Sequence, residues 1–350
     1  MEFGVKVPHT EPFSKLRYDQ LLSEGYFRHG YIMAAYEMMH FNEQITGVIP
    51  LRNDLQSTPF TKSQRKLLRK NRKKFRREIT PLNITTEKEV LYRKYKKARF
   101  PEQIERSLED FFGHTTHPFS EECYDTWEIN YYNNHNELVA VSYFDKGKYS
   151  LGSIMCTFDM AYDNDSLGFY SMLEEIEYAR SLELRYYYAG YVLDVPSCFD
   201  YKLRLQNTQF YNWEGDWSSW KTFDLSKVYR QKLLQQLCQT MDFIHTHTPL
   251  NGGLRTYKEY FNEIWSDTFH RDPPKLNAPY FLNFSINDSL QLIVLYTPRN
   301  KAYEVLLLEY GFHEKLNHLG CAHNLHQLVI MIESQYKHAF GSSSFNMKSL

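Results

Sequence analysis

The stretch from residue 61 to residue 77, TKSQRKLLRKNRKKFRR, constrains the fold most because it contains ten lysines and arginines and no acid. Its apolar and neutral residues recur at helical spacing, which predicts an amphipathic helix with a single packing face. Thr61 and Gln64 have the spacing of a capping box, so we expect the helix to begin there. The predicted packing face consists of Gln64, Leu67, Leu68, Asn71 and Phe75.

Lysines and arginines recur four residues apart in two series along this helix, from Lys62 to Lys74 and from Arg65 to Arg77, and these series contain six like-charge pairs. Each pair costs roughly 0.2–0.5 kcal/mol, so the isolated helix would be destabilised by about 2 kcal/mol. A polyanion lying along the basic face would remove that cost and release counterions. The alternatives are a solvated basic face and an import signal.

The positive charge is local, because the whole chain of 350 residues has a net charge of only -1. This distribution indicates one anion-binding site and argues against a protein that binds nucleic acid over its whole surface. Aromatic residues make up 16% of the chain, and phenol rings suit base stacking as well as protein cores.

Five cysteines are scattered without a CxxC pair, which is typical of reduced thiols in a cytosolic protein. The N-terminal stretch lacks the apolar core of a signal peptide, and the longest apolar runs are too short to span a membrane. We therefore expect a cytoplasmic protein with no membrane partner.

The central part of the chain alternates between patterns typical of strands and of helices. Within the helix expected over 166–182, Glu174, Glu175 and Glu177 would point away from the apolar face. Gly190 lies inside the last predicted strand, where a glycine usually marks a bulge or the close approach of a ligand. The strands are expected over 126–132, 137–144, 150–160 and 185–193.

The character of the sequence changes near residue 225, so we predict three parts. They are an N-terminal portion (1–80) that ends in the basic helix, a central domain (81–225) and a C-terminal extension of unknown role (226–350). In the extension we expect a chain break at Asn251-Gly252-Gly253, a helix over 257–265, and strands over 281–286, 291–296 and 303–309.

Eight short segments of the first 220 residues, in this order, resemble the arginyl-tRNA–protein transferases and the related bacterial leucyl enzymes. The resemblance covers about residues 16–220 and rests on the ordered set, not on any single motif. The segments are Gly25–Gly30, Ile49–Arg52, Ser63–Lys66, Leu91-Tyr92-x-x-Tyr95, Thr157-Phe158-Asp159, Ser166-Leu167-Gly168, Tyr187–Tyr191 and Tyr201-Lys202.

The resemblance implies an α/β fold of the GNAT-like acyltransferase kind, with a central mixed sheet and helices on both sides. It also implies transfer of an amino acid from aminoacyl-tRNA to the α-amine of protein N-termini, often acidic ones, which marks those proteins for degradation. Arginine is the favoured donor and leucine the other. No cofactor is expected. The family's paired N-terminal cysteines are missing, since no cysteine precedes Cys123, so a metal bound in that way is not expected.

Four residues are candidates for the chemistry that the resemblance implies, which needs an aligned amine, a proton acceptor and an oxyanion site. Gly190 at a strand bulge would free backbone N–H groups for the oxyanion, unless it is a packing glycine. Asp159 would act as the base or orient the amine, unless it caps a turn. Tyr187 and Tyr191, on one strand face, would hold the amine or the terminal adenosine, unless they are core tyrosines.

Two groups of cations would bind the substrates. Gly25 and Gly30 bracket Arg28 in what reads as a turn, and Arg28 and Lys202 would bind the carboxylate of an acidic N-terminal residue. The basic helix would bind the phosphates of the tRNA. Such contacts position the tRNA on the protein but do not recognise its base sequence. Its tRNA-binding residues would be Lys62, Gln64, Arg65, Lys66, Arg69, Lys70 and Lys73.

Two other functions stay open from the sequence. One is a non-catalytic tRNA- or RNA-binding protein on a transferase scaffold. The other is a small-molecule N-acyltransferase, against which the absence of any G-x-G loop counts. A histidine and cysteine cluster near the C-terminus fits no standard zinc spacing, and we predict no metal there. Its members are His313, His318, Cys321, His323 and His326.

Overall fold

The computed structural model describes residues 14–30, 32–101, 107–112, 124–257, 276, 278–309 and 315–340. Contacts divide the chain into two compact units. The large unit comprises the described residues up to Tyr36 and those from Val48 to Phe223, and the small unit comprises Glu37–Gly47 and the described residues from Asp224 onward. The three-part division made from the sequence stays a prediction.

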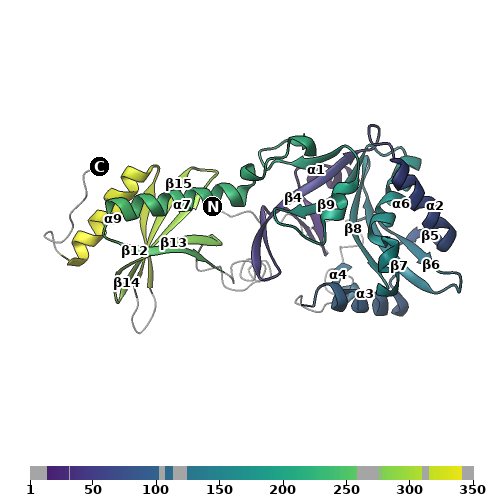
Figure 1. The fold of residues 1–350 in the computed structure, drawn as a ribbon, viewed down its shortest axis with the longest axis horizontal. Helices are drawn as coiled ribbons and strands as arrows, with labels where there is room; N and C mark the ends of the chain where they lie inside the picture. The colour runs from purple at the N-terminus through teal and green to yellow at the C-terminus, as the bar shows by residue number, and fades with distance from the viewer. Residues whose placement is uncertain are drawn as a thin grey trace. The chain divides into compact units, whose positions relative to one another are not determined.

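A mixed sheet forms the centre of the large unit, with strand order β11-β10-β4-β9-β8-β7-β6-β5 (Figure 1). Among the strands that the structure describes, only β8 and β9 pair in parallel. A separate hairpin joins β1 (Phe27–His29) to β2 (Ile32–Ala34). The predicted α/β class with a central mixed sheet is confirmed. The strands are β4 (Gln44–Asp54), β5 (Arg76–Pro81), β6 (Thr126–Tyr132), β7 (Leu138–Lys146), β8 (Ser150–Phe158), β9 (Tyr186–Leu193), β10 (Thr208–Tyr211) and β11 (Trp217–Ser219).

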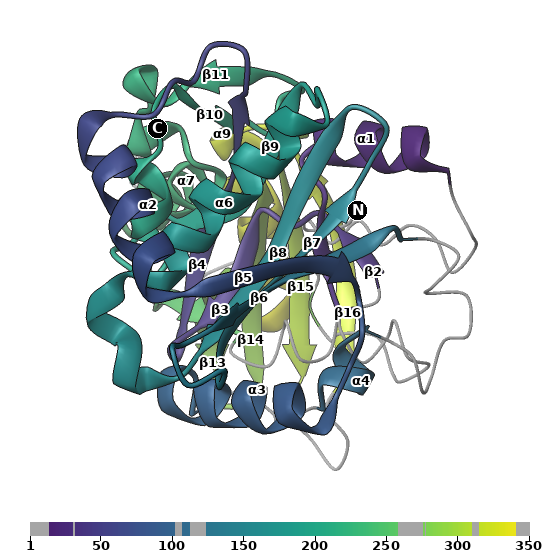
Figure 2. The same ribbon diagram turned by 90° about the vertical axis from the view of Figure 1, so that its right-hand side faces the viewer.

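Helices cover both faces of this sheet, because strand β7 alternates apolar and small residues that are buried on either side. Ser142 and Phe144 face α6, whereas Val141 and Tyr143 face α3 and α4. Helix α2 packs against α6 (Figure 2). The helices are α1 (Lys15–Ser23), α2 (Lys62–Lys74), α3 (Thr86–Arg99), α4 (Leu108–Phe112) and α6 (Leu167–Ser181).

In its described residues, the small unit is an antiparallel sheet with two helices packed on its core. Strand β3 (Met38–Phe41) pairs with the first residues of β4 within the same unit. The strands predicted in the C-terminal region are confirmed as β13, β14 and β15. The elements are α7 (Tyr229–His247), β12 (Asn251–Thr256), β13 (Tyr280–Asn287), β14 (Leu290–Thr297), β15 (Ala302–Glu309), β16 (Lys315–Ala322) and α9 (Leu325–Phe340).

The predicted chain break at Asn251-Gly252-Gly253 is wrong, because these residues begin strand β12. A Cβ on Gly252 would lie 2.1 Å from the carbonyl oxygen of Asn283, so glycine permits a close approach to β13. Most of the helix predicted over 257–265 lies outside the described residues.

Within the described ranges, no helix has the length and apolar character needed to cross a membrane. The same residues contain no group of three or more histidines, cysteines and acids placed to hold a metal ion, and His313 of the predicted cluster lies outside them.

Candidate active site

Strands β8 and β9 form a fork. They run parallel and pair at three positions, from Ser150 opposite Tyr186 to Gly152 opposite Tyr188. Beyond that point no sheet pairing joins the two strands among the residues that the structure describes, although β8 continues to Phe158 and β9 to Leu193. Backbone groups on the facing edges are therefore not used by the sheet, which is the setting in which a ligand can approach the main chain.

The bulge predicted at Gly190 is confirmed. Leu51 of β4 lies opposite Gly190 while Arg52 lies opposite Tyr188, so the register skips Ala189. Gly190 has a φ of 80°, a left-handed conformation that favours glycine. A bulge leaves its extra residue unpaired, so Ala189 has no partner in the ladder with β4.

The bulge also overturns one expectation, that Tyr187 and Tyr191 share a face of the strand. Tyr187 pairs with Asn53 and Tyr191 with Pro50, and residues three apart on β4 point to opposite faces. Tyr187 accordingly reaches Glu175 on α6, whereas the ring of Tyr191 packs against Phe27 of β1 at 4.8 Å. The residue inserted at the bulge reverses the alternation of side chains between the two faces of β9, so Tyr187 and Tyr191 point to opposite faces.

Glu175 is the residue at the fork that the sequence pattern misplaced. It was expected on the polar face of its helix, yet it has no exposure to solvent. The hydroxyl of Tyr187 donates to its Oε2 at 2.7 Å, and the hydroxyl of Ser142 donates to Oε1. Burial raises the pKa of Glu175 to about 7, although these hydrogen bonds oppose the shift. A carboxyl with this pKa can exchange a proton near neutral pH.

Lys202 approaches the same place from the short helix Asp200–Arg204. Its Nζ donates to the carbonyl oxygen of Tyr191 at 3.0 Å and lies 3.2 Å from where a Cβ on Gly190 would be. Burial lowers the pKa of Lys202 to about 8, and the nearby Cys198 and Glu175 oppose that shift. The structure thus brings together Gly190, Tyr187 and Lys202 of the predicted residues, and adds Glu175.

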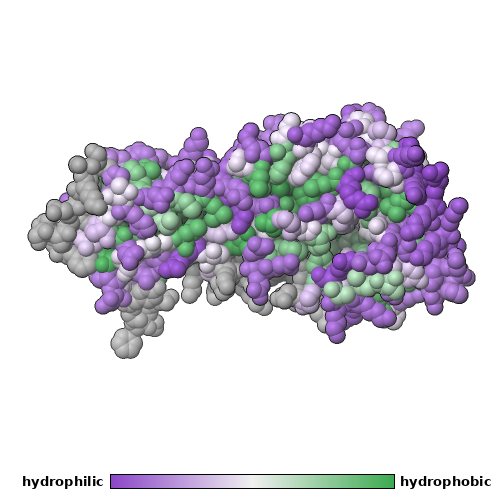
Figure 3. All heavy atoms as spheres, in the orientation of Figure 1, coloured by the Kyte–Doolittle hydropathy of each residue, from purple (hydrophilic) through white to green (hydrophobic). Residues whose placement is uncertain are grey.

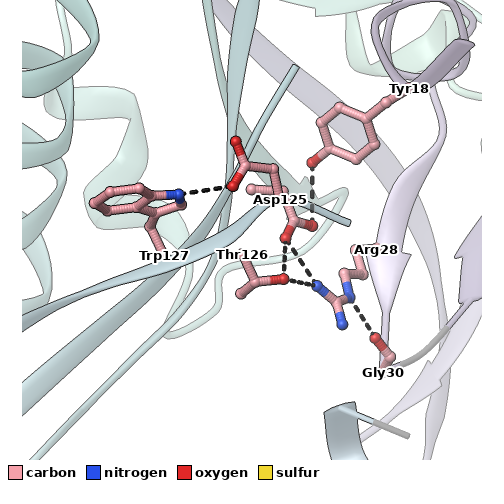
Figure 4. A network of polar contacts seen from close by, with 7 residues as sticks. Tyr18, Arg28, Gly30, Asp125, Thr126 and Trp127 are labelled. Carbon is pink, nitrogen blue, oxygen red and sulfur yellow. Dashed lines mark hydrogen bonds and ion pairs between the residues drawn. The ribbon is translucent and has the colours of Figure 1, made fainter. Parts of the chain in front are cut away.

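Arg28 lies on strand β1 and not in the turn expected between two glycines (Figure 4). Its guanidinium is almost fully buried and forms an ion pair with Asp145 at 2.8 Å. It also donates to Thr126 and to the carbonyl oxygen of Gly30, each at 2.7 Å. These bonds use Nε and Nη1, and within the described chain Nη2 has no hydrogen-bond partner.

A narrow pocket connects Arg28 to the fork. Its lining includes Arg28, Gly152 and Ser153 of β8, and Tyr188 and Gly190 of β9. Burial raises the pKa of Asp145, and Arg28 beside it opposes the shift. Arg28 therefore pairs with Asp145 inside the large unit, and its role in binding the carboxylate of an acceptor stays a prediction.

Asp159 lies at the end of β8, where its Oδ1 accepts a hydrogen bond from the backbone N–H of Ala161 at 2.9 Å. It thereby caps the short helix Met160–Asp165, which is the structural alternative given for a strand-end aspartate. Its catalytic role stays a prediction.

The basic helix α2 begins with the capping box expected from Thr61 and Gln64. Its predicted packing face is confirmed, since Gln64, Leu68 and Asn71 are buried and Phe75 follows them. The amide of Gln64 donates to the carbonyl oxygen of Arg204 at 2.9 Å. Gln64 therefore anchors the helix and is not part of its exposed face.

Glu174 of α6 and Asp165, which precedes α6, neutralise the positive charge on one side of α2. Arg72 binds Glu174 through Nε at 2.7 Å, and Arg77 binds the same carboxylate. Lys70 and Lys74 bind Asp165. These pairs remove part of the like-charge cost that the sequence implies, without any external polyanion.

The other cations of α2 are exposed and form no ion pair within the described chain, although Arg65 donates to the carbonyl oxygen of Phe60. Hydrophilic residues dominate the surface where α2 lies (Figures 1 and 3). This exposed basic face consists of Lys62, Arg65, Lys66, Arg69 and Lys73.

The fork lies in the central mixed sheet of an α/β unit. Residues 87–212, which contain both strands of the fork, α6 and Lys202, match the family model described as arginine-tRNA-protein transferase, C terminus. This part of the chain therefore resembles the C-terminal part of the arginine-tRNA-protein transferases.

Curated relatives agree with this family. The aspartate/glutamate leucyltransferase of Gluconacetobacter diazotrophicus is 29% identical over 170 residues, which are 49% of this chain and 64% of that protein. The protein of the same name from Leptospira interrogans serovar copenhageni is 26% identical over 228 residues, which are 63% of this chain and 85% of that protein. The chain thus spans just under two thirds of the first relative.

Solved structures give looser likenesses. The crystal structure of FemX aligns over 52% of this chain and 61% of that chain, with 8% identity and a TM-score of 0.34. A GCN5-related glucosamine N-acetyltransferase region of a fungal β-N-acetylglucosaminidase aligns over 59% of this chain and 23% of that chain, with 11% identity and a TM-score of 0.33. Likenesses of this size indicate nothing about function.

Proposed function

We propose that this protein transfers an amino acid from aminoacyl-tRNA to the N-terminal α-amine of proteins, with acidic N-termini as acceptors. The observation that carries the proposal is that the family match covers the fork at which Gly190, Glu175 and Lys202 converge. The family model is named for arginine and the relatives for leucine, and we favour arginine as the donor. Transfer would mark the acceptor for degradation in the cytoplasm.

The reaction forms a C–N bond between the amine and the aminoacyl carbonyl and breaks the ester C–O bond to the tRNA ribose. The ester is already activated, so the enzyme mainly aligns the reactants. Backbone N–H groups at the bulge of Ala189 and Gly190 would stabilise the oxyanion. The amine gives up one proton to the protein, and the protein returns one proton to the ribose oxygen, which leaves as a hydroxyl group.

Glu175 is the group best suited to take part in that proton transfer, because its pKa of about 7 makes both of its forms available. Tyr187 orients it by a direct hydrogen bond. Asp159 remains our candidate for orienting the amine. Tyr191, in an aromatic cluster with Phe27 and Phe199, would support the terminal adenosine.

The acceptor's acidic side chain would lie between Arg28 and Lys202. Nη2 of Arg28 has no hydrogen-bond partner within the described chain. The guanidinium is buried, which strengthens its attraction for a carboxylate. Lys202, with a pKa of about 8, is mostly protonated at neutral pH and supplies a second cation.

The exposed basic face of α2 would grip the tRNA by its phosphates. The support is that its five cations are solvent-exposed and carry no acidic partner within the described residues. Lys70 belongs to the predicted set as well, although Asp165 already binds it at 3.2 Å. Gln64 would act indirectly by fixing the helix.

A transfer assay tests the function directly. The protein is mixed with tRNA charged with labelled arginine or leucine, and with peptides that begin with Asp, Glu, Lys or Ala. Label on the Asp and Glu peptides from one charged tRNA would establish the reaction and name the donor. Salt-sensitive tRNA binding without transfer from either donor would instead support a non-catalytic RNA-binding protein.

A further inference from the structure

A second site lies in the small unit, outside the segment that matches the family. A hollow of about 740 Å³ opens between α7, the β14–β15 turn and the beginning of α9. Hollows of roughly 300–1,000 Å³ are the size at which proteins bind small organic ligands. Its lining residues are Gln236, Phe243, Tyr296, Lys301, Tyr303, His323, Asn324, Leu325, His326 and Gln327.

Aromatic rings from two elements line this hollow. Phe243 of α7 is half-buried and is held by a stacking contact with His247, at 4.0 Å between ring centroids. Tyr296 and Tyr303 are buried with their rings 4.9 Å apart. Gln236 fixes Tyr303 by donating to its hydroxyl oxygen at 2.8 Å. An aromatic lining favours a flat aromatic ligand.

Two amide side chains in the lining have fixed orientations. Gln236 uses its NH2 group on Tyr303, which leaves its carbonyl oxygen to accept. Gln327 uses its carbonyl oxygen to accept from the backbone N–H of His323 at 2.9 Å, which leaves its NH2 group to donate. The hollow therefore offers one oriented acceptor and one oriented donor, the combination that glutamine and asparagine use to bind the edge of a nucleobase.

The charge of the lining is positive. It contains Lys301 and two exposed histidines, His323 and His326, and none of its ten residues is an acid. Lys301 forms no ion pair within the described part of the chain. A lysine beside imidazole N–H donors, at the edge of an aromatic site, binds an anion such as phosphate.

From these three features we propose that the hollow binds a nucleoside phosphate, with its base against the aromatic lining and its phosphate at Lys301. The ligand is either a free nucleotide or one nucleotide of a single-stranded RNA segment, since both present the same chemistry. The proposal is independent of the transfer reaction, because none of these residues belongs to the fork.

Calorimetric titration of the full chain with adenosine 5′-monophosphate tests the site, with inorganic phosphate as the comparison. We expect saturable binding of the nucleotide and much weaker binding of phosphate. Phe243→Ala and Lys301→Glu should each raise the Kd about ten-fold, the effect of losing about 1.4 kcal/mol. Lys315→Glu is the matched control, since Lys315 is an exposed lysine of the same unit outside the hollow. Lys301→Glu changes an exposed side chain and should leave the fold intact. If the Phe243→Ala variant unfolds, Lys301→Glu alone tests whether the nucleotide binds in the hollow.

A short single-stranded oligoadenylate distinguishes the two sources of the ligand. It is titrated into the Lys66→Glu, Arg69→Glu variant, so that α2 contributes little. Binding tighter than that of the mononucleotide, and weakened by Lys301→Glu, identifies an RNA strand, whereas equal binding identifies a free nucleotide. The proposal is overturned if neither probe binds, if phosphate binds as tightly as the nucleotide, or if Lys301→Glu changes no Kd.

Discussion

Tyr187 donates its hydroxyl hydrogen to Glu175 across 2.7 Å, and neither side chain is exposed to solvent. The two residues come from neighbouring elements, β9 and α6, and meet beneath the fork. Because burial disfavours the charged carboxylate, Glu175 loses its proton at a higher pH in the folded protein than in the unfolded chain. This difference links the site to the stability of the fold.

Glu175→Gln should flatten the dependence of stability on pH. With a pKa of about 7 folded and 4.5 unfolded, Glu175 favours folding below pH 4.5, and this contribution is lost as the pH rises through 7. The loss amounts to about 3 kcal/mol, which the variant should not show. Urea unfolding between pH 4.5 and pH 8 measures it. Glu177→Gln, on the outer side of the same helix, should keep the wild-type dependence.

Gly190→Ala should abolish transfer while lowering stability only modestly. The left-handed φ of 80° costs an alanine about 1–2 kcal/mol, and the added Cβ would displace Lys202 from 3.2 Å. Gly215→Ala is the control, because its φ of 112° is also unfavourable for alanine but nothing lies within 4 Å of its Cβ. The control should lose stability and keep activity. Equal activity of both variants would remove the bulge from the proposed mechanism.

Local signals predicted the features that depend on neighbouring residues. The capping box of Thr61 and Gln64, the packing face of α2 and the bulge at Gly190 each follow from a few adjacent side chains, and the structure confirms them. The strands of the central sheet followed from alternation in the same way.

Features that depend on distant segments could not be predicted. Glu174 and Glu175 resemble an exposed acidic face in a helical projection, but α6 lies between the sheet and α2. Glu174 is buried because Arg72 and Arg77, about a hundred residues earlier, neutralise it. The opposite orientations of Tyr187 and Tyr191 depend on a register with β4 that their own sequence does not contain.

Arg28→Met should destabilise the large unit by about 3–5 kcal/mol, because it leaves Asp145 buried without its partner. The double variant Arg28→Met, Asp145→Leu should regain most of that loss, since neither charge remains. If Arg28 also binds the acceptor, the refolded double variant should lose transfer to peptides that begin with Asp or Glu far more than general activity. Thermal unfolding and the peptide transfer assay measure the two effects. Unchanged preference for acidic peptides would confine Arg28 to its structural pairing.

Charge reversal on the exposed face of α2 should weaken tRNA binding and reduce its salt dependence. Lys66→Glu with Arg69→Glu removes two phosphate contacts, so the slope of log K against log salt should decrease by about 2. Neither residue has an acidic partner within the described chain, so the fold should tolerate the change. Lys148→Glu with Lys221→Glu, two exposed lysines elsewhere in the large unit, is the control with the same net charge. If both double variants change the slope equally, binding depends on net charge and not on this helix. If only the α2 variant changes it, and transfer falls in proportion to tRNA occupancy, α2 positions the donor while the fork performs the chemistry.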